Sequence, residues 1–189
     1  DVHSWDHPAY LDKVVEYLNP ESTEGGQLTR EEAYFTNQKL GQIRSLPKGY
    51  AWESADVGDE AYADGRIAAK VIERLELHQS ETNSPFFIMA GFVKPHLPFT
   101  APQKYWDMHD PADFSVMASQ TAPEWAPAFA GKRGGEIVNY APLTVENIQE
   151  ITIQRKLMHG YYAAASYADA QIGKVLNTLD ELKLSDNTI

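Results

Sequence analysis

The residues that most constrain the fold form an unbroken apolar run, "PFFIMAGFV", at residues 85–93. A strand with both faces buried carries such a continuous apolar sequence, as in a parallel sheet covered by helices. In the preceding residues 59–77, apolar side chains recur at three- and four-residue spacings, which predicts an amphipathic helix. A helix, a loop and a buried strand are half of an α/β unit, so we expect an α/β fold.

A long amphipathic pattern occupies the C-terminal part of the chain. Thr144 is a good N-terminal cap, and apolar residues then recur along one stripe as far as Leu182. We expect one long helix there, with Gly160 as the place for a break or a close contact. The turn residues "KLSDNT" end the pattern, and Thr188 and Ile189 are expected to begin another buried strand.

The chain divides into four regions by composition. Its 189 residues suit one domain or a large part of one. Residues 1–58 are polar and irregular and are expected to form a covering region, in which Thr29 caps a helix. Residues 59–99 hold the helix and the buried strand, residues 100–143 form a proline-rich excursion, and residues 144–189 hold the long helix and the start of the next strand. Both ends look interrupted, so we expect an internal segment of a single larger domain.

The composition argues against several classes of function. The formal net charge is −11, which repels a phosphate backbone, so no nucleic-acid partner is expected. The chain has no cysteine, which removes disulfides, thiolate metal sites and a cysteine nucleophile from these residues. No apolar run approaches the roughly 20 residues of a membrane span, and no signal peptide is visible. An anionic substrate stays possible if specific residues build a locally basic pocket.

Two basic residues, Lys94 and His96, follow the apolar run in the segment "KPHLPF". In open α/β sheets, ligands bind beyond the carboxyl ends of the strands, and the two residues are expected at such a position. Pro95 and Pro98 restrict the backbone around them, so an ammonium and an imidazole can point at one tetrahedral anion. Two plainer alternatives stay open: Lys94 as a solvated lysine at the strand end, and His96 as a loop histidine with ordinary hydrogen bonds.

No other group of residues makes a complete catalytic site. His3 and His7 lie among Asp1 and Asp6 and are a weak candidate for binding a divalent ion, because no helix or strand fixes their geometry. Asp169 lies among small residues on the long helix, where an intramolecular tie is favoured over a catalytic role. No nucleophile elbow, glycine-rich phosphate loop or zinc spacing is present, so we assign no metal ligand within the chain.

Two separate segments resemble the sulfatase family of the alkaline-phosphatase-like superfamily. One is "PFFIMAGFVKPHLPF" followed by "PQKYWDM", which is similar to the strand of the iduronate-2-sulfatase-like branch that runs into Lys-Pro-His-x-Pro-Phe. The other is the helical segment that begins "GYYAAASYADAQIGK", which matches the pattern of that branch at Tyr161, Ala163, Ser166, Asp169, Gln171 and Gly173. The resemblance implies part of an alkaline-phosphatase-like sandwich, with a mostly parallel central sheet covered by helices.

The resemblance also implies a chemistry, the hydrolysis of sulfate esters by a formylglycine nucleophile beside a divalent cation, usually calcium. It gives His96 a hydrogen bond to the sulfate or leaving-group oxygen, and it gives Lys94 a share in holding negative charge in the same pocket. The nucleophile motif and the metal ligands of the family are absent from these residues. We therefore expect the cation and the formylglycine to lie outside this segment, and these residues alone to be inactive.

The implied partners are a sulfated small molecule or carbohydrate and the remainder of the parent catalytic domain, in a protein exported to the bacterial periplasm or the extracellular space. Specificity is expected in the excursion from Thr100 to Pro142, where Trp106, Trp125 and Tyr140 either stack on sugar faces or pack internally. Two alternative functions stay open: a phosphate or phosphonate ester hydrolase of the same superfamily, and a catalytically silent sulfatase-like binding protein.

Overall fold

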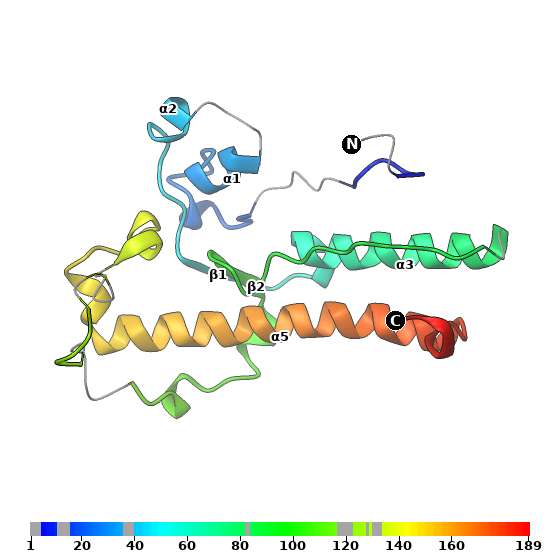
Figure 1. The fold of residues 1–189 in the computed structure, drawn as a ribbon. Helices are drawn as coiled ribbons and strands as arrows, with labels where there is room; N and C mark the ends of the chain where they lie inside the picture. Colours follow the sequence, from blue (N-terminus) through cyan, green and yellow to red (C-terminus); the bar gives the residue numbers. More distant parts are fainter. Residues whose placement is uncertain are drawn as a thin grey trace.

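A parallel strand pair and two long helices form the centre of the computed structural model, which describes residues 5–10, 16–35, 40–81, 84–116, 123–127, 129 and 134–189. Strand β1 (Trp52–Ala55) leads through helix α3 (Ala63–Glu81) and an extended segment to strand β2 (Phe99–Pro102). The two strands pair in parallel, with Trp52 opposite Phe99 and Ala55 opposite Pro102. This β1–α3–β2 crossover confirms the α/β class of fold (Figure 1).

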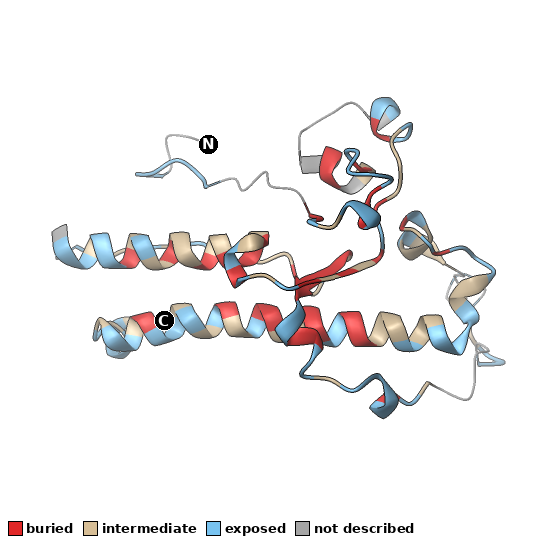
Figure 2. Cartoon of the chain, turned by 180° about the vertical axis from the view of Figure 1, so that it is seen from behind, coloured by how far each residue is buried: buried red, intermediate tan, exposed pale blue. Residues whose placement is uncertain are grey.

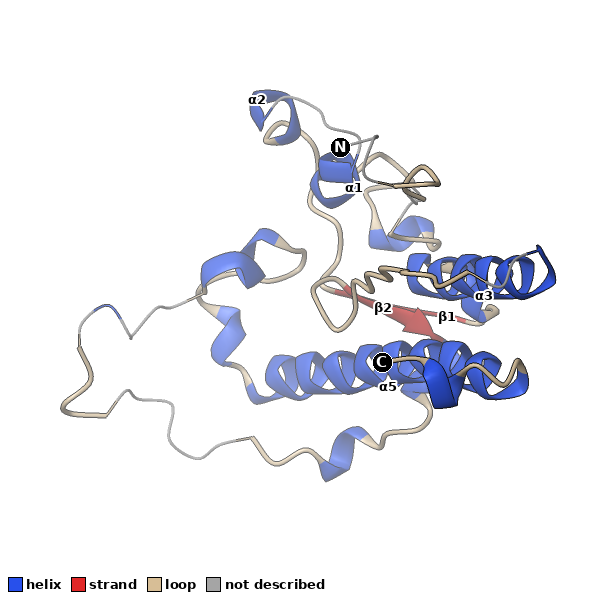
Figure 3. Cartoon of the chain, turned by 45° about the vertical axis from the view of Figure 1, so that its right-hand side comes forward, coloured by secondary structure: helices blue, strands red, loops and turns tan. Residues whose placement is uncertain are grey.

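The other elements are short, with the exception of one helix. The remaining α-helices are α1 (Arg30–Phe35), α2 (Leu40–Ile43), α4 (Gln103–Trp106) and the long α5 (Ile151–Glu181). Short 3-10 helices lie at Pro20–Ser22, Asp59–Ala61, Pro111–Asp113, Gly135–Asn139, Asn147–Gln149 and Ser185–Asn187. The strand pair lies beside the start of α3 and across the middle of α5 (Figure 3).

The core lies where the strand pair, the start of α3 and the middle of α5 meet (Figure 2). It combines alanines on the strands and on α5 with large aromatic side chains, namely Ala55, Tyr62, Ala101, Tyr105, Trp106, Ala163 and Tyr167. The small residues let the backbones approach, and the aromatic rings fill the remaining space. This packing holds the start of α3 and strand β2 in one arrangement, which matters because the segment with Lys94 and His96 runs between them.

Gly160 marks a close contact rather than a break in α5. The helix is continuous from Ile151 to Glu181. A Cβ atom at Gly160 would lie 3.0 Å from the Cβ atom of Phe99 and 3.0 Å from the ring of Trp106. The missing side chain therefore lets α5 approach β2 and α4.

The buried strand predicted at residues 85–93 is not observed. These residues run extended along α3 (Figure 1), and the rings of His78 and Phe86 lie 5.1 Å apart between them. Phe87 and Met89 keep 76% and 71% of their surface exposed. A strand needs a neighbouring strand to satisfy its backbone hydrogen bonds, and the described part of the chain pairs no strand with this segment.

The long C-terminal helix begins later than predicted. Thr144 Oγ1 accepts a hydrogen bond from Asn147 N at 3.2 Å, and Asn147 Oδ1 accepts one from Thr144 N at 2.8 Å, so the pair caps a short turn that precedes α5. The α-helix itself starts at Ile151. The strand expected from Thr188 and Ile189 is not formed, and both residues follow a 3-10 helix at the end of the chain.

Candidate functional site

The candidate site is the loop at residues 93–98, which joins the extended segment beside α3 to strand β2. His96 N donates to Val93 O at 3.0 Å and closes a turn within the loop. Just beyond it, Phe99 N donates to Ala51 O at 2.8 Å. Two peptide bonds of the loop are cis, Lys94–Pro95 and Leu97–Pro98. The predicted position beyond the carboxyl end of a strand is therefore wrong for this structure, because the loop precedes β2 and follows no strand.

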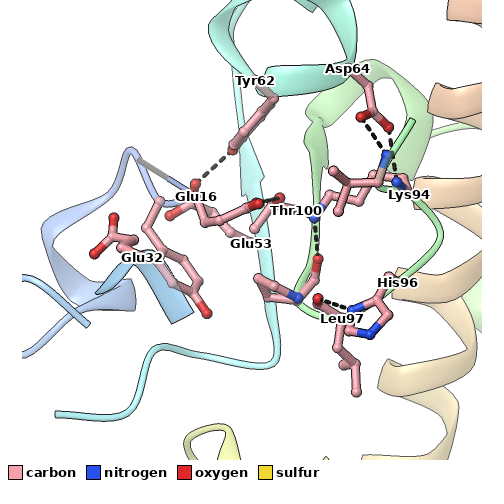
Figure 4. Close-up of polar contacts among 12 residues, drawn as sticks. Glu16, Glu32, Glu53, Tyr62, Asp64, Lys94, His96, Leu97 and Thr100 are labelled. Atoms are coloured by element: carbon pink, nitrogen blue, oxygen red, sulfur yellow. Dashed lines mark hydrogen bonds and ion pairs between the residues drawn. The ribbon is translucent and has the colours of Figure 1, made fainter. Parts of the chain in front are cut away.

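His96 is exposed on this loop. Its side chain keeps 60% of its surface accessible, and Nε2 lies 3.6 Å from Glu136 Oε1. The other ring nitrogen, Nδ1, lies 2.6 Å from Leu97 O (Figure 4), a contact that suits an Nδ1–H donor. Nε2 is consequently the ring atom that is directed away from the loop backbone.

Lys94 is buried, with 7% of its surface exposed. Its Nζ donates to Pro98 O at 2.7 Å and lies 3.2 Å from Glu16 Oε2 (Figure 4). Thr100 Oγ1 donates to the same Glu16 oxygen at 3.4 Å. The structure therefore does not bring Lys94 and His96 together on one point, because the ammonium lies inside and the imidazole lies at the surface. Burial also rules out the alternative of a solvated lysine.

Asp64 holds the start of the loop, although it is absent from the sequence-based candidates. Its side chain is buried, with 1% of the residue exposed. Oδ1 accepts a hydrogen bond from Val93 N at 2.8 Å, and Oδ2 accepts one from Lys94 N at 2.9 Å. Burial raises the pKa of the carboxyl group, and the two amide hydrogen bonds only partly offset this. An aspartate in the first turn of a helix is already favoured by the macrodipole, so no signal in the sequence distinguishes this contact.

Four carboxylates are buried in this part of the molecule, at Glu16, Glu32, Glu53 and Asp64. Glu16 and Asp64 contact the loop, whereas Glu32 accepts a hydrogen bond from Thr29. Glu53 accepts hydrogen bonds from Leu18 N at 2.9 Å, Asn19 N at 3.0 Å and Tyr62 OH at 2.6 Å. Burial and this carboxylate raise the pKa of the Tyr62 hydroxyl. Within the residues that the structure describes, Lys94 is the one buried lysine or arginine. The carboxylate of Glu16, 3.2 Å from Lys94 Nζ, compensates the positive charge of this buried ammonium.

A second polar cluster surrounds Asp59, on the 3-10 turn before α3. The carboxylate contacts Lys104 Nζ at 2.7 Å and Lys174 Nζ at 2.6 Å, and it accepts a hydrogen bond from Tyr105 OH at 3.1 Å. Burial alone would raise the pKa of Asp59, but the hydrogen bonds from the two lysines outweigh it and lower the pKa to about 2. The cluster joins the turn before α3 to α4 and α5, so its role is structural.

We expect the Asp59 cluster to make stability pH-dependent. The folded-state pKa of about 2 lies below the ordinary value of 3.8, so the contribution is complete above pH 3.8 and is lost as pH falls toward 2. Its size is about 1–2 kcal/mol, reduced by solvent screening of the partly exposed lysines. The urea midpoint of Asp59→Asn should lie below that of the wild type near pH 5, and the gap should close toward pH 2. A gap that is constant with pH would contradict this assignment.

The aromatic candidates in the excursion separate into two kinds. Trp106 and Tyr140 are packing residues, with 3% and 5% of their surface exposed, whereas Trp125 is 86% exposed. On α5, Asp169 is exposed, and the buried polar residue close to it is Gln171. Of the three candidates for stacking on a sugar, Trp125 is the one with an accessible ring.

The described residues supply no metal centre. Within these ranges, no group of three or more His, Asp or Glu side chains is placed to hold a metal ion. Asp1 and His3 of the N-terminal candidate cluster lie outside the described residues. In the same part of the chain, none of the helices has the length and apolar character needed to cross a membrane.

The parallel β1–α3–β2 unit and the histidine-bearing loop between α3 and β2 define the chain as an α/β protein with an exposed imidazole at the edge of its strand pair. The family model described as Sulfatase matches residues 8–189. The chain belongs to the sulfatase family.

Named relatives in this family are longer than the chain. Iduronate 2-sulfatase from Mus musculus is 28% identical, over 99% of this chain and 32% of its own length. Iduronate 2-sulfatase from Homo sapiens is 29% identical, over 71% of this chain and 25% of its own length. An arylsulfatase from Clostridium perfringens is 28% identical, over 60% of this chain and 22% of its own length. The chain thus spans about a third or less of the length of these proteins.

Proposed function

We propose that the chain is an internal segment of a sulfatase that hydrolyses sulfate esters, and that His96 contacts the sulfate group. The observation that carries this proposal is the exposed imidazole of His96 on a loop held by buried groups, in a chain of the sulfatase family. An exposed imidazole is accessible to an anionic substrate, and the buried anchors keep its backbone in place.

His96 acts through Nε2, since Nδ1 faces Leu97 O. When Nε2 carries a proton, it donates a hydrogen bond to a sulfate or leaving-group oxygen. As the bond between sulfur and the leaving oxygen breaks, this proton moves to that oxygen and the imidazolium becomes neutral imidazole. The hydrogen bond and the proton transfer both stabilise the negative charge that develops in the transition state.

Lys94 enters the proposal as a positive charge close to the same loop. The resemblance gives it a share in holding the sulfate, whereas its ammonium contacts Pro98 O and Glu16. Direct contact with the substrate requires the ammonium to leave these two partners. Without that movement, Lys94 contributes to the site through the conformation of the loop.

Other parts of the proposed enzyme supply the nucleophile and the metal. We place the formylglycine and the divalent cation, usually calcium in this family, on residues outside this segment. The substrate is a sulfated small molecule or carbohydrate, for which Trp125 offers an exposed aromatic face. Export to the periplasm or the extracellular space is part of the same proposal, on the ground of the resemblance.

The proposal is tested with the full-length protein and a matched pair of chromogenic esters, an aryl sulfate and the corresponding aryl phosphate. We expect turnover of the sulfate, with a kcat/KM well above that for the phosphate. The segment 1–189 alone is expected to turn over neither ester. Preference for the phosphate, or for the corresponding phosphonate ester, would establish the alternative hydrolase. No turnover of any ester would support the silent binding protein.

A further inference from the structure

We propose that Asp64 is a positioning residue for His96, and that its buried carboxylate fixes the two amides from which the histidine-bearing turn begins. This inference rests on the proposed function, because it concerns the placement of the imidazole that contacts the sulfate. Asp64 itself does not touch the substrate, since it is 1% exposed and its carboxylate is directed at the backbone of the loop (Figure 4).

The two carboxylate oxygens of Asp64 hold consecutive peptide groups. Oδ1 accepts the hydrogen bond of Val93 N at 2.8 Å and Oδ2 accepts that of Lys94 N at 2.9 Å. One hydrogen bond would fix a distance, but two from a single planar group also fix the orientation of the chain at this point. The start of the loop is therefore constrained in both position and direction.

This constraint is passed to His96 through one further hydrogen bond. Val93 N is held by Asp64, and Val93 O accepts from His96 N at 3.0 Å. A shift of Val93 therefore moves the backbone from which the imidazole projects. The imidazole has no comparable buried anchor of its own, because its side chain is 60% exposed.

The far end of the loop is anchored by different groups. Lys94 Nζ donates to Pro98 O at 2.7 Å, and Phe99 N donates to Ala51 O at 2.8 Å beside β1. With this end attached to the strand pair, the arrangement of the turn depends on how the other end is attached to α3. Asp64 makes that attachment, and the next residue, Gly65, is itself held by Tyr167 OH on α5 at 2.6 Å.

A stabilising role alone is a weak explanation for this carboxylate. Transferring a charged group into the interior is unfavourable, and here burial raises the pKa of Asp64 despite its amide partners. What the carboxylate offers, and an apolar side chain does not, is a pair of acceptors for two successive N–H groups. Its geometry thus suits the fixing of a turn.

The test is Asp64→Asn in the full-length enzyme, assayed with two aryl sulfates that differ in leaving group. Asparagine has nearly the same shape but one acceptor oxygen, so one of the two amides loses its partner. We expect kcat for a phenyl sulfate to fall about tenfold or more, with KM within about threefold. The fall should be smaller for 4-nitrophenyl sulfate, because a good leaving group depends less on a proton from His96.

The quantity to compare is the ratio of kcat for phenyl sulfate to kcat for 4-nitrophenyl sulfate. This ratio does not depend on how much of the variant is folded. If Asp64→Asn gives too little folded enzyme to assay, Asp64→Glu, which keeps two oxygens but displaces them, is measured in the same way. Glu53→Gln is the matched control, because Glu53 is also buried and also accepts from two successive amides, Leu18 N and Asn19 N. It should lower the melting temperature without changing the ratio.

The outcomes separate this inference from the proposed function. A leaving-group effect is a larger fall of kcat for phenyl sulfate than for 4-nitrophenyl sulfate. Such an effect in both His96→Ala and Asp64→Asn supports the positioning role. An effect in His96→Ala alone, with equal losses for both esters in Asp64→Asn, would overturn the positioning role and leave the proposed function intact. A wild-type enzyme that hydrolyses neither sulfate would overturn both.

Discussion

His96→Ala in the full-length enzyme is expected to lower kcat for an aryl sulfate by at least ~100-fold, which is the usual scale for the loss of a proton donor or an oxyanion contact. The melting temperature should hardly change. The side chain is 60% exposed, and it contacts Leu97 O and the similarly exposed Glu136. Removing an exposed side chain leaves no cavity in the core, so catalysis and stability separate at this position.

A second histidine controls for the loss of an imidazole as such. His7 is also exposed and lies outside the loop, so His7→Ala should leave both kcat and the melting temperature near the wild-type values. The measurements are steady-state kinetics and a thermal melt on the same preparations. Unchanged activity in His96→Ala, together with a lower melting temperature, would return His96 to the plainer role of a loop histidine with structural hydrogen bonds.

The helices could be predicted because their signals are local. Thr29 caps α1 as predicted, since its Oγ1 accepts a hydrogen bond from Glu32 N at 3.4 Å and Thr29 N donates in return to Glu32 Oε2 at 2.9 Å. The apolar spacing that predicted α3 places Ala68, Val71 and Leu75 in the core. The start of α5 was less predictable, because Thr144 and Asn147 satisfy each other's amides in a short turn and leave α5 to begin at Ile151. Competition between two local hydrogen-bonding patterns is not visible in apolar periodicity.

The strands could not be located in the same way, because pairing depends on residues far apart in the chain. The run at 85–93 has the composition of a buried strand, but composition does not say which strand lies beside it. The pair that forms is "WESA" with "FTAP", and neither segment shows a long apolar run. Glu53 is buried in β1 because Tyr62 and two amides satisfy its carboxylate. These partners become apparent only in three dimensions.

Only part of the candidate site could be predicted, because it too depends on contacts between residues far apart in the chain. The sequence indicated a proline-restricted segment that carries Lys94 and His96, and the structure has a loop there on which His96 is exposed. It also predicted that Lys94 faces the same anion, whereas Glu16, which lies 78 positions earlier, contacts the ammonium. Asp64, which lies 30 positions before Lys94, could not be linked to the loop from its position in a helical turn. Long-range contacts of buried charges therefore decide which residues of the motif stay accessible.

Gly65→Ala is expected to destabilise the full-length protein by about 3 kcal/mol or more, since it combines overpacking with the loss of buried hydrogen bonds. A Cβ atom at Gly65 would overlap with the carbonyl group of Asp59 and with Glu60 N, all of them backbone atoms that cannot rotate away. The turn would have to move as a unit. That movement would break the contacts of Tyr167 OH, which accepts from Gly65 N at 2.6 Å and donates to Asp59 O at 2.8 Å.

Gly173→Ala is the matched control, and its effect should have the opposite sign. Gly173 also lies inside a long helix, α5, but a Cβ atom there would meet nothing within 4 Å. Alanine in place of an unhindered helical glycine stabilises by roughly 0.5–1 kcal/mol. The measurement is the urea midpoint of each variant, compared with that of the wild type. If the start of α3 packs against the 3-10 turn as described, the two substitutions must move the midpoint in opposite directions. A loss of stability in both would mean that helix α5 approaches another part of the full-length protein at Gly173.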